Sequence, residues 1–168
     1  YKALDPMDRV VAVKTMSARI DANPHLRERF FREARAAAQL SHRNIITIYY
    51  MDEDGGRAYL AMEFLDGKDL RTIISGREPF TLEQRIDVMG QVCAGLSHAH
   101  SKGVVHRDIK PSNLFITQSG DVKILDFGLA RFVTSEFTAS SESMGTPGYM
   151  SPEQLQSSKV DQRSDIYS

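Results

Sequence analysis

The chain has 168 residues, 41% of them hydrophobic and 26% charged, which is the ordinary composition of a globular protein. Its formal net charge of -1 gives no reason to expect binding to nucleic acid or to an anionic membrane. The single cysteine, Cys93, excludes an internal disulfide and a cysteine-based zinc site, and no apolar run is long enough to span a membrane. We therefore expect one domain or two small lobes in a reducing, cytoplasmic setting.

Residues 9–16 are rich in β-branched side chains, which predicts a strand near the N-terminus. Successive side chains of a strand point to opposite faces, so Ala12 and Lys14 share one face. A lysine in a strand is usually a solvated edge residue, and only its neighbours in space could give it a functional role.

Asn23 and Pro24 mark the start of a helix, because asparagine caps helices and proline fits their first turn. Apolar residues recur at helical spacing as far as Leu40. Glu33 lies at the edge of this apolar stripe, where it can face inward and remain partly hydrated. Glu28 is the competing position for an inward-facing carboxylate.

Residues 44–51 and 57–64 are apolar, β-branched or aromatic runs that flank the turn-rich sequence 52–56, so they predict a hairpin. Residues 62–67 then leave the sheet and enter a helical region. By composition alone, this crossing is an ordinary linker.

Thr81 and Gln84 form a capping box, which starts a second long helix. We expect one apolar stripe of this helix to face the core, with its cysteine as a buried, unreactive thiol. The stripe comprises Leu82, Ile86, Met89, Val92, Cys93 and Leu96. His98 and His100 could suggest a metal-binding pair, but no third ligand follows at a suitable spacing, so we expect satisfied or exposed histidines.

The segment from His106 to Asn113 places a carboxylate, an ammonium and a carboxamide within six residues, around a proline that cannot extend a helix. Such a segment is a loop that aims side chains. Asp108 can accept a proton, Lys110 can neutralise a phosphate, and Asn113 can hold a hard cation through oxygen.

Residues 114–117 and 121–125 predict a second hairpin, with Asn113 at its entry and Asp126 at its exit. The hairpin brings these two oxygen ligands close together, so both could bind one cation.

Three segments carry a family resemblance: His106–Asn113, Asp126–Phe127–Gly128 and Gly145–Glu153. The first two resemble the catalytic loop and the metal-binding motif of protein kinases, while Lys110 and the third segment resemble the serine/threonine branch, in the style of bacterial eukaryotic-like kinases. The resemblance implies an α+β, bilobal protein-kinase-like fold. Residues 1–64 would form a small antiparallel-sheet lobe with one helix, and residues 65–168 a mainly helical lobe. Both would be truncated, because the glycine-rich loop and the later helices are absent.

The resemblance also implies the function of a serine/threonine protein kinase, with ATP and Mg²⁺ as cofactors and proteins bearing Ser or Thr as substrates. The implied catalytic residues are Asp108, Lys110 and Asn113, and the implied metal ligands are Asn113 and Asp126. The implied nucleotide-binding residues are Lys14, Glu33, Ala12, Met62, Glu63, Leu65, Asp69 and Phe115. Among these, Lys14 would grip the phosphates while Glu33 braces it, and the backbones of Glu63 and Leu65 would bind adenine.

Supporting roles follow from the same resemblance. His106 and Phe127 would pack with Ile48 and Ala37 in the active state, and Asp165 would support the backbone of the catalytic loop.

Residues 129–144 are rich in serine and threonine without a clear period. Thr138 and Ser140 are the expected phosphoacceptors there, with Arg107 as the group that binds the phosphate and with self-association for autophosphorylation. The competing interpretation is an inactive pseudokinase or a nucleotide-binding regulatory fragment. Such modules usually lose one of the key polar residues, whereas all are present in this sequence.

Overall fold

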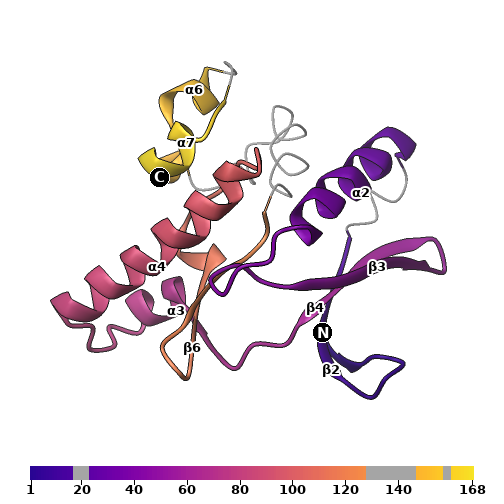
Figure 1. The fold of residues 1–168 in the computed structure, drawn as a ribbon, viewed down its shortest axis with the longest axis horizontal. Coiled ribbons are helices and arrows are strands. Elements are labelled where there is room, and N and C mark those ends of the chain that lie inside the picture. The colour runs from indigo at the N-terminus through magenta and orange to yellow at the C-terminus, as the bar shows by residue number, and fades with distance from the viewer. Residues whose placement is uncertain (17–22, 128–146, 157–159) are drawn as a thin grey trace.

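The computed structural model describes residues 1–16, 23–127, 147–156 and 160–168, and two antiparallel sheets form its framework. The first sheet has the order β1-β2-β4-β3 and contains β1 (Lys2–Leu4), β2 (Val10–Thr15), β3 (Ile48–Asp54) and β4 (Arg57–Glu63). The second has the order β5-β6-β7 and contains β5 (Gly67–Asp69), β6 (Leu114–Thr117) and β7 (Val122–Ile124). The helices are α2 (Pro24–Ala38), α3 (Leu70–Ser75), α4 (Leu82–Ser101), α6 (Pro152–Leu155) and α7 (Arg163–Tyr167), with 3-10 turns at Pro111–Asn113 and Pro147–Tyr149. In Figure 1, α2 accompanies the first sheet and α3 and α4 accompany the second, which is the expected arrangement of an antiparallel-sheet lobe and a more helical one.

Helix α2 packs on the first sheet and begins where the sequence predicted. The Asn23 side chain accepts hydrogen bonds from the backbone N–H groups of the second and third residues after it, and Pro24 lies in the first turn. The apolar face of the helix buries Phe30 and Ala34 in one cluster with Leu60 of β4. Removing this apolar surface from water is what fixes α2 to the sheet.

The strand predicted at residues 44–51 begins only at Ile48. Residues 44–46 pair with Ile124 of the other sheet, whereas Thr47 still pairs with Glu63 of β4. The Ile46 N–H donates to the Ile124 carbonyl at 3.0 Å, and the Ile124 N–H donates to the Asn44 carbonyl at 2.9 Å. An apolar run predicts extended backbone but does not say which strand it pairs with. The segment therefore joins the two sheets instead of extending the hairpin.

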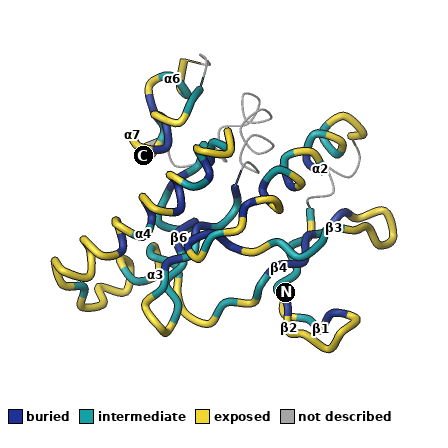
Figure 2. The backbone as a smooth tube through the Cα atoms, viewed as in Figure 1, coloured by how far each residue is buried: buried dark blue, intermediate teal, exposed yellow. Residues whose placement is uncertain are grey.

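Helix α4 starts with the predicted capping box, in which Thr81 and Gln84 exchange hydrogen bonds between side chain and backbone. The predicted core stripe is wrong for four of its six members: Leu82, Ile86, Met89 and Cys93 are exposed. The buried face instead comprises Val88, Val92, Gly95, Leu96 and Ala99. Both faces are apolar, and the one with smaller side chains packs on the second sheet, so periodicity alone pointed to the wrong face (Figure 2).

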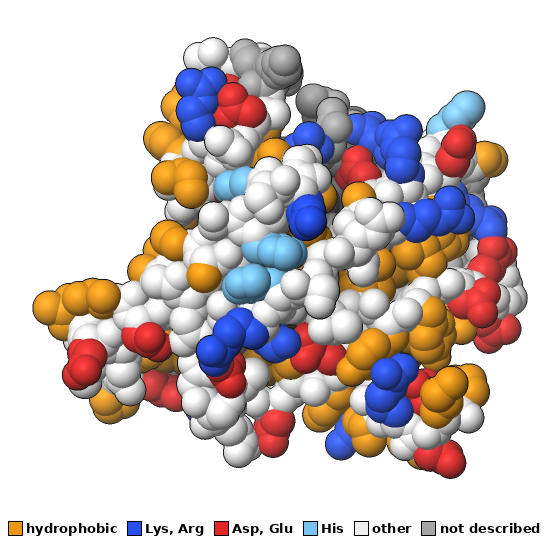
Figure 3. Space-filling model, in the orientation of Figure 1, with side chains coloured by type: hydrophobic (Ala, Val, Ile, Leu, Met, Phe, Trp, Pro, Cys, Tyr) orange, Lys and Arg blue, Asp and Glu red, His pale blue; other side chains and the backbone are white. Residues whose placement is uncertain are grey.

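The surface carries charges of both signs, which Figure 3 shows interspersed over the viewed face, in keeping with the small net charge. No helix in the described ranges is both long enough and apolar enough to cross a lipid bilayer.

Candidate active site

Three polar side chains converge in the loop between α4 and β6. The amide Nδ2 of Asn113 donates to the backbone carbonyl of Asp108 at 2.8 Å and to its carboxylate Oδ2 at 2.9 Å. The Lys110 ammonium lies 2.7 Å from the same Oδ2. The loop can fold back in this way because Pro111 opens a single 3-10 turn, which ends at Asn113. The sequence therefore folds locally to gather the three residues predicted to be catalytic.

A buried carboxylate from α7 holds the backbone of this loop in place. Asp165 of α7 accepts hydrogen bonds from the backbone N–H groups of His106 at 2.8 Å and Arg107 at 2.6 Å. It also accepts one from Nε2 of His100 at 2.7 Å, a contact that the sequence did not reveal. Arg107 has φ of 69°, a conformation that costs a residue with a side chain about 1–2 kcal/mol and needs such support. The predicted supporting role of Asp165 is thus confirmed by its hydrogen bonds.

His106 connects the loop between α4 and β6 to the residues after β7. It is fully buried, its Nε2 donates to the Leu125 carbonyl at 2.7 Å, and its Nδ1 accepts from the Asp108 N–H at 3.2 Å. Burial lowers the pKa of His106, although the Leu125 carbonyl opposes this shift, so the ring is neutral. Its ring also packs edge-on against Phe127, with 4.7 Å between centroids. Phe127 in turn lies in one core cluster with Ala37, with Ile48 packed against it.

Asp126 lies near Asn113 because it follows β7 after a single residue, Leu125. The Leu125 N–H donates to the Asn113 carbonyl at 2.9 Å, and Asp126 follows with φ of 62°. Its carboxylate is 2.6 Å from the Lys14 ammonium, which reaches it from β2 of the other sheet. A residue near the start of the chain and one far along it are therefore brought to a single site.

Lys14 and Glu33, which the resemblance pairs with each other, have other partners in this structure. Lys14 pairs with Asp126, while Glu33 lies 3.6 Å from Nε of Arg29, one turn earlier on α2. The Oε2 atom of Glu33 is buried and has no hydrogen-bond partner among the described residues. Among the described contacts, the Lys14 ammonium thus pairs with Asp126 and not with Glu33.

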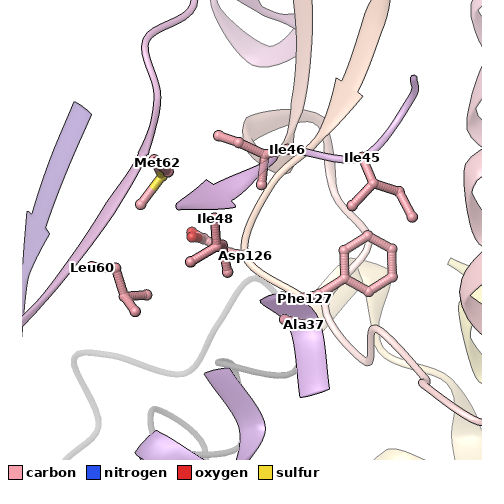
Figure 4. A pocket seen from close by; sticks show the side chains of 8 residues that line it. All are labelled: Ala37, Ile45, Ile46, Ile48, Leu60, Met62, Asp126 and Phe127. Atoms are coloured by element: carbon pink, nitrogen blue, oxygen red, sulfur yellow. The ribbon is translucent and has the colours of Figure 1, made fainter. Parts of the chain in front are cut away.

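Ala12 and Met62 lie opposite each other in the pairing of β2 with β4. Behind Met62 is an apolar cavity of about 10 Å³, and Figure 4 shows Leu60, Asp126 and Phe127 among its lining side chains. This volume is about what one water molecule needs, so the cavity is too small for a nucleotide base.

The remaining predicted nucleotide residues lie where the chain passes from the first sheet to the second. The side chain of Glu63 accepts from the Lys123 ammonium at 2.8 Å and from the Thr47 N–H at 2.7 Å, which fixes the end of β4. Leu65 is partly buried against the cluster that contains Met62.

Asp69 lies opposite Phe115 in the pairing of β5 with β6, so these two predicted residues are also neighbours. Its carboxylate caps α3, accepting from the Thr72 N–H at 2.9 Å and the Thr72 hydroxyl at 2.7 Å. Burial opposes the shift, but these hydrogen bonds hold the pKa of Asp69 below its usual value. The capping role was not predicted from the sequence.

The donor atoms at Asn113 and Asp126 fit a magnesium ion. Both amide hydrogens of Asn113 are used by Asp108, which leaves its side-chain oxygen without a partner among the described contacts. Within the described residues, no cluster of three or more His, Cys, Asp or Glu side chains forms a complete metal cage. One carboxylate and one amide oxygen suit Mg²⁺, which keeps several waters and takes further oxygens from phosphates.

The Arg107 side chain has a buried Nε that finds no hydrogen-bond partner in the part of the chain that the structure describes. The predicted phosphoacceptors Thr138 and Ser140 lie outside the described residues, so their pairing with Arg107 remains a prediction.

Comparison with known proteins extends these observations to the whole chain. Residues 1–168 match the sequence model of the family described as "Protein kinase domain". Serine/threonine-protein kinase PknL of Mycobacterium tuberculosis (strain ATCC 25618 / H37Rv) is 41% identical over 170 residues, which cover 100% of this chain and 43% of PknL. The probable serine/threonine-protein kinase PknB of Corynebacterium glutamicum is 40% identical over 166 residues, covering 95% of this chain and 26% of that protein.

Solved structures agree with this match. The crystal structure of the Mycobacterium tuberculosis PknI kinase domain superposes with a TM-score of 0.78 at 28% identity, covering 98% of this chain and 61% of that domain. The chain therefore spans less than half the length of the two curated relatives and about three fifths of the solved domain.

Proposed function

The chain belongs to the protein kinase domain family, and on this premise we propose that the complete domain containing it is an ATP-dependent serine/threonine protein kinase. It transfers the γ-phosphate of ATP to Ser or Thr hydroxyls of protein substrates. The observation that carries this proposal is the convergence of Asp108, Lys110 and Asn113 in one loop beside Asp126, which pairs with Lys14 from the other sheet. Phosphoryl transfer needs positioning and charge neutralisation more than covalent chemistry, and these groups supply both.

Asp108 is the proposed acceptor of the substrate hydroxyl proton. Its Oδ2 is held by Asn113 and Lys110, while Oδ1 has no partner among the described contacts and can face a hydroxyl. The same two neighbours fix the carboxylate in orientation, which a positioned general base requires. The Lys110 ammonium, held beside the same carboxylate, would neutralise the charge that develops on the transferred group.

Lys14 and Asp126 are the proposed residues for the nucleotide phosphates and their metal. A magnesium ion bound to Asn113 and Asp126 would supply positive charge against the phosphate oxygens. Lys14 would leave Asp126 to hold the phosphates, and Glu33 would then become its partner. The backbone groups of Glu63 and Leu65 would orient the adenine between Ala12 and Phe115, with Asp69 near the ribose.

Substitution of Asp108 by Asn in the complete kinase domain tests the proposal. We expect the turnover number with MgATP and a Ser/Thr peptide to fall about 10²- to 10⁴-fold, because positioned proton acceptors contribute rate factors of that size. ATP affinity should change little. Asp66→Asn, at an exposed carboxylate away from the loop, is the matched control.

Two outcomes would contradict the proposal. Wild-type protein that binds MgATP but transfers no phosphate would support the inactive-module alternative. Equal turnover of Asp108→Asn and Asp66→Asn would remove Asp108 from the mechanism.

A further inference from the structure

Gln91 of α4 makes four side-chain hydrogen bonds. Its Oε1 accepts from Nδ2 of Asn44 at 2.8 Å and from the Val122 N–H at 2.8 Å. Its Nε2 donates to Oδ2 of Asp87 at 2.9 Å and to the Gly120 carbonyl at 3.1 Å. Both acceptor sites and both donor hydrogens of the amide are thus used, so the side chain has no hydrogen-bonding capacity left for another partner.

These bonds join α4 to the segment that links the two sheets. Asn44 is buried, and its second amide hydrogen goes to the Val122 carbonyl at 3.0 Å. Gly95, one turn after Gln91, lets this segment approach closely. A Cβ atom at that position would lie 2.7 Å from Cδ1 of Ile124 and 3.2 Å from the Asn44 carbonyl oxygen. Gln91 and Gly95 therefore form the contact surface of α4 for Asn44 and β7.

This contact surface can influence the position of the candidate metal site through β7. Val122 begins that strand, and only Leu125 separates its last residue, Ile124, from Asp126. A shift of β7 along its axis would move Asp126 relative to Asn113, whose carbonyl holds the Leu125 N–H. Besides its pairing with β6, β7 is therefore held at both ends, by Gln91 at the start of the strand and by Asn113 after it.

We propose that Gln91 is a positioning residue for Asp126, acting through Asn44 and β7 without touching the reacting atoms. This inference rests on the proposed kinase function for its catalytic readout. Loss of the Gln91 oxygen leaves the Val122 N–H and one Asn44 amide hydrogen without partners inside the protein. β7 is then held less firmly at its start, although its pairing with β6 remains, and Asp126 holds the metal less well.

The test compares four variants of the complete kinase domain with wild type. Gln91→Leu removes all four hydrogen bonds at similar volume, and Gln91→Asn withdraws the amide by one methylene. The double variant that combines Gln91→Glu with Asp87→Asn keeps the hydrogen bonds accepted from Asn44 and Val122 and reverses the bond to position 87, but it gives up the bond to the Gly120 carbonyl. Gln39→Leu, at the exposed C-terminal cap of α2, is the matched control.

Two measurements separate positioning from folding. The first is the Mg²⁺ concentration for half-maximal phosphotransfer at saturating ATP. We expect Gln91→Leu to raise it about threefold to tenfold, the size of one or two lost hydrogen bonds, with a smaller change in turnover at saturating Mg²⁺. The second is backbone hydrogen exchange over residues 122–126, which should accelerate in Gln91→Leu and Gln91→Asn. The double variant keeps the bonds to Asn44 and Val122, so both quantities should change less in it than in Gln91→Leu.

The proposal is overturned if Gln91→Leu, or Gln91→Asn should the leucine variant not fold, needs no more Mg²⁺ than Gln39→Leu. It is equally overturned if the variants unfold more easily while their Mg²⁺ requirement stays at the wild-type value. A wild-type protein without phosphotransfer would defeat the proposed function instead, and the exchange measurement would still decide whether Gln91 holds β7.

Discussion

Replacing Asp165 by Asn should destabilise the catalytic loop by a predictable amount. The carboxylate accepts three hydrogen bonds, two through Oδ2 and one through Oδ1, and its side chain is fully buried. Asparagine has one acceptor atom. If its oxygen keeps the bonds from His106 and His100, its NH₂ group faces the Arg107 N–H at the position of a 2.6 Å contact.

The variant thus loses one hydrogen bond outright, and the other two no longer have a charged acceptor. A hydrogen bond to a charged group contributes about 1.5–3 kcal/mol, so we expect the free energy of unfolding to fall by about 2–4 kcal/mol. Domains are typically stable by about 5–15 kcal/mol, so the variant should still fold at 25 °C. Turnover should fall with it, because the strained backbone of Arg107 directly precedes Asp108.

Urea unfolding of the complete domain, followed by circular dichroism, measures the loss. Asp66→Asn, which makes the same chemical change at an exposed site, should lie within about 0.5 kcal/mol of wild type. If Asp165→Asn differed from that control by less than about 1 kcal/mol, the three hydrogen bonds would not carry the support that we assign to them.

Two further predictions concern α4 and His106. In the 168-residue chain, Leu96→Ala should cost about 2–5 kcal/mol of unfolding free energy, whereas Leu82→Ala should cost less than about 1 kcal/mol, because Leu96 is 3% exposed and Leu82 is 71% exposed. Equal losses in urea unfolding would mean that another surface covers Leu82. Burial lowers the pKa of His106 below its ordinary value of 6.5. Below that pH, the unfolded chain binds a proton at His106 more readily than the folded chain does. Unfolding free energy should therefore decrease as the pH falls below about 6.5, and His106→Phe should flatten that decrease; an unchanged pH profile in the variant would contradict the assignment.

The sequence predicted best those features that depend on neighbours along the chain. The cap at Asn23 and the capping box at Thr81 require only residues within one turn, and both appear as expected. The hairpin of β6 and β7 is also local, and it brings Asn113 near Asp126 as its two ends imply. Local rules suffice here because no distant partner competes for these groups.

Features that depend on residues distant in the sequence could not be predicted from it. Asn44 could have begun a strand of the first hairpin, but its side chain and carbonyl are taken by Gln91 and β7. The buried face of α4 was misjudged because two apolar faces compete, and the one that admits Gly95 against Ile124 packs more closely. Hydrophobic periodicity does not distinguish the two strand partners of residues 44–46 or the two apolar faces of α4, since both alternatives have the same period.

The pairing of Lys14 with Asp126 shows how little free energy separates the arrangement described here from the one that the family implies. Both side chains are about one-third exposed or more, at 41% and 32%, so the ion pair contributes about 0–1 kcal/mol despite its 2.6 Å length. Glu33 meanwhile keeps a buried oxygen without a donor, which costs about 1–3 kcal/mol. A triphosphate would give Lys14 a partner of higher charge, and a divalent cation would do the same for Asp126. Moving the ammonium toward Glu33 would also satisfy its buried oxygen, so MgATP binding would favour the exchange at each of the three residues.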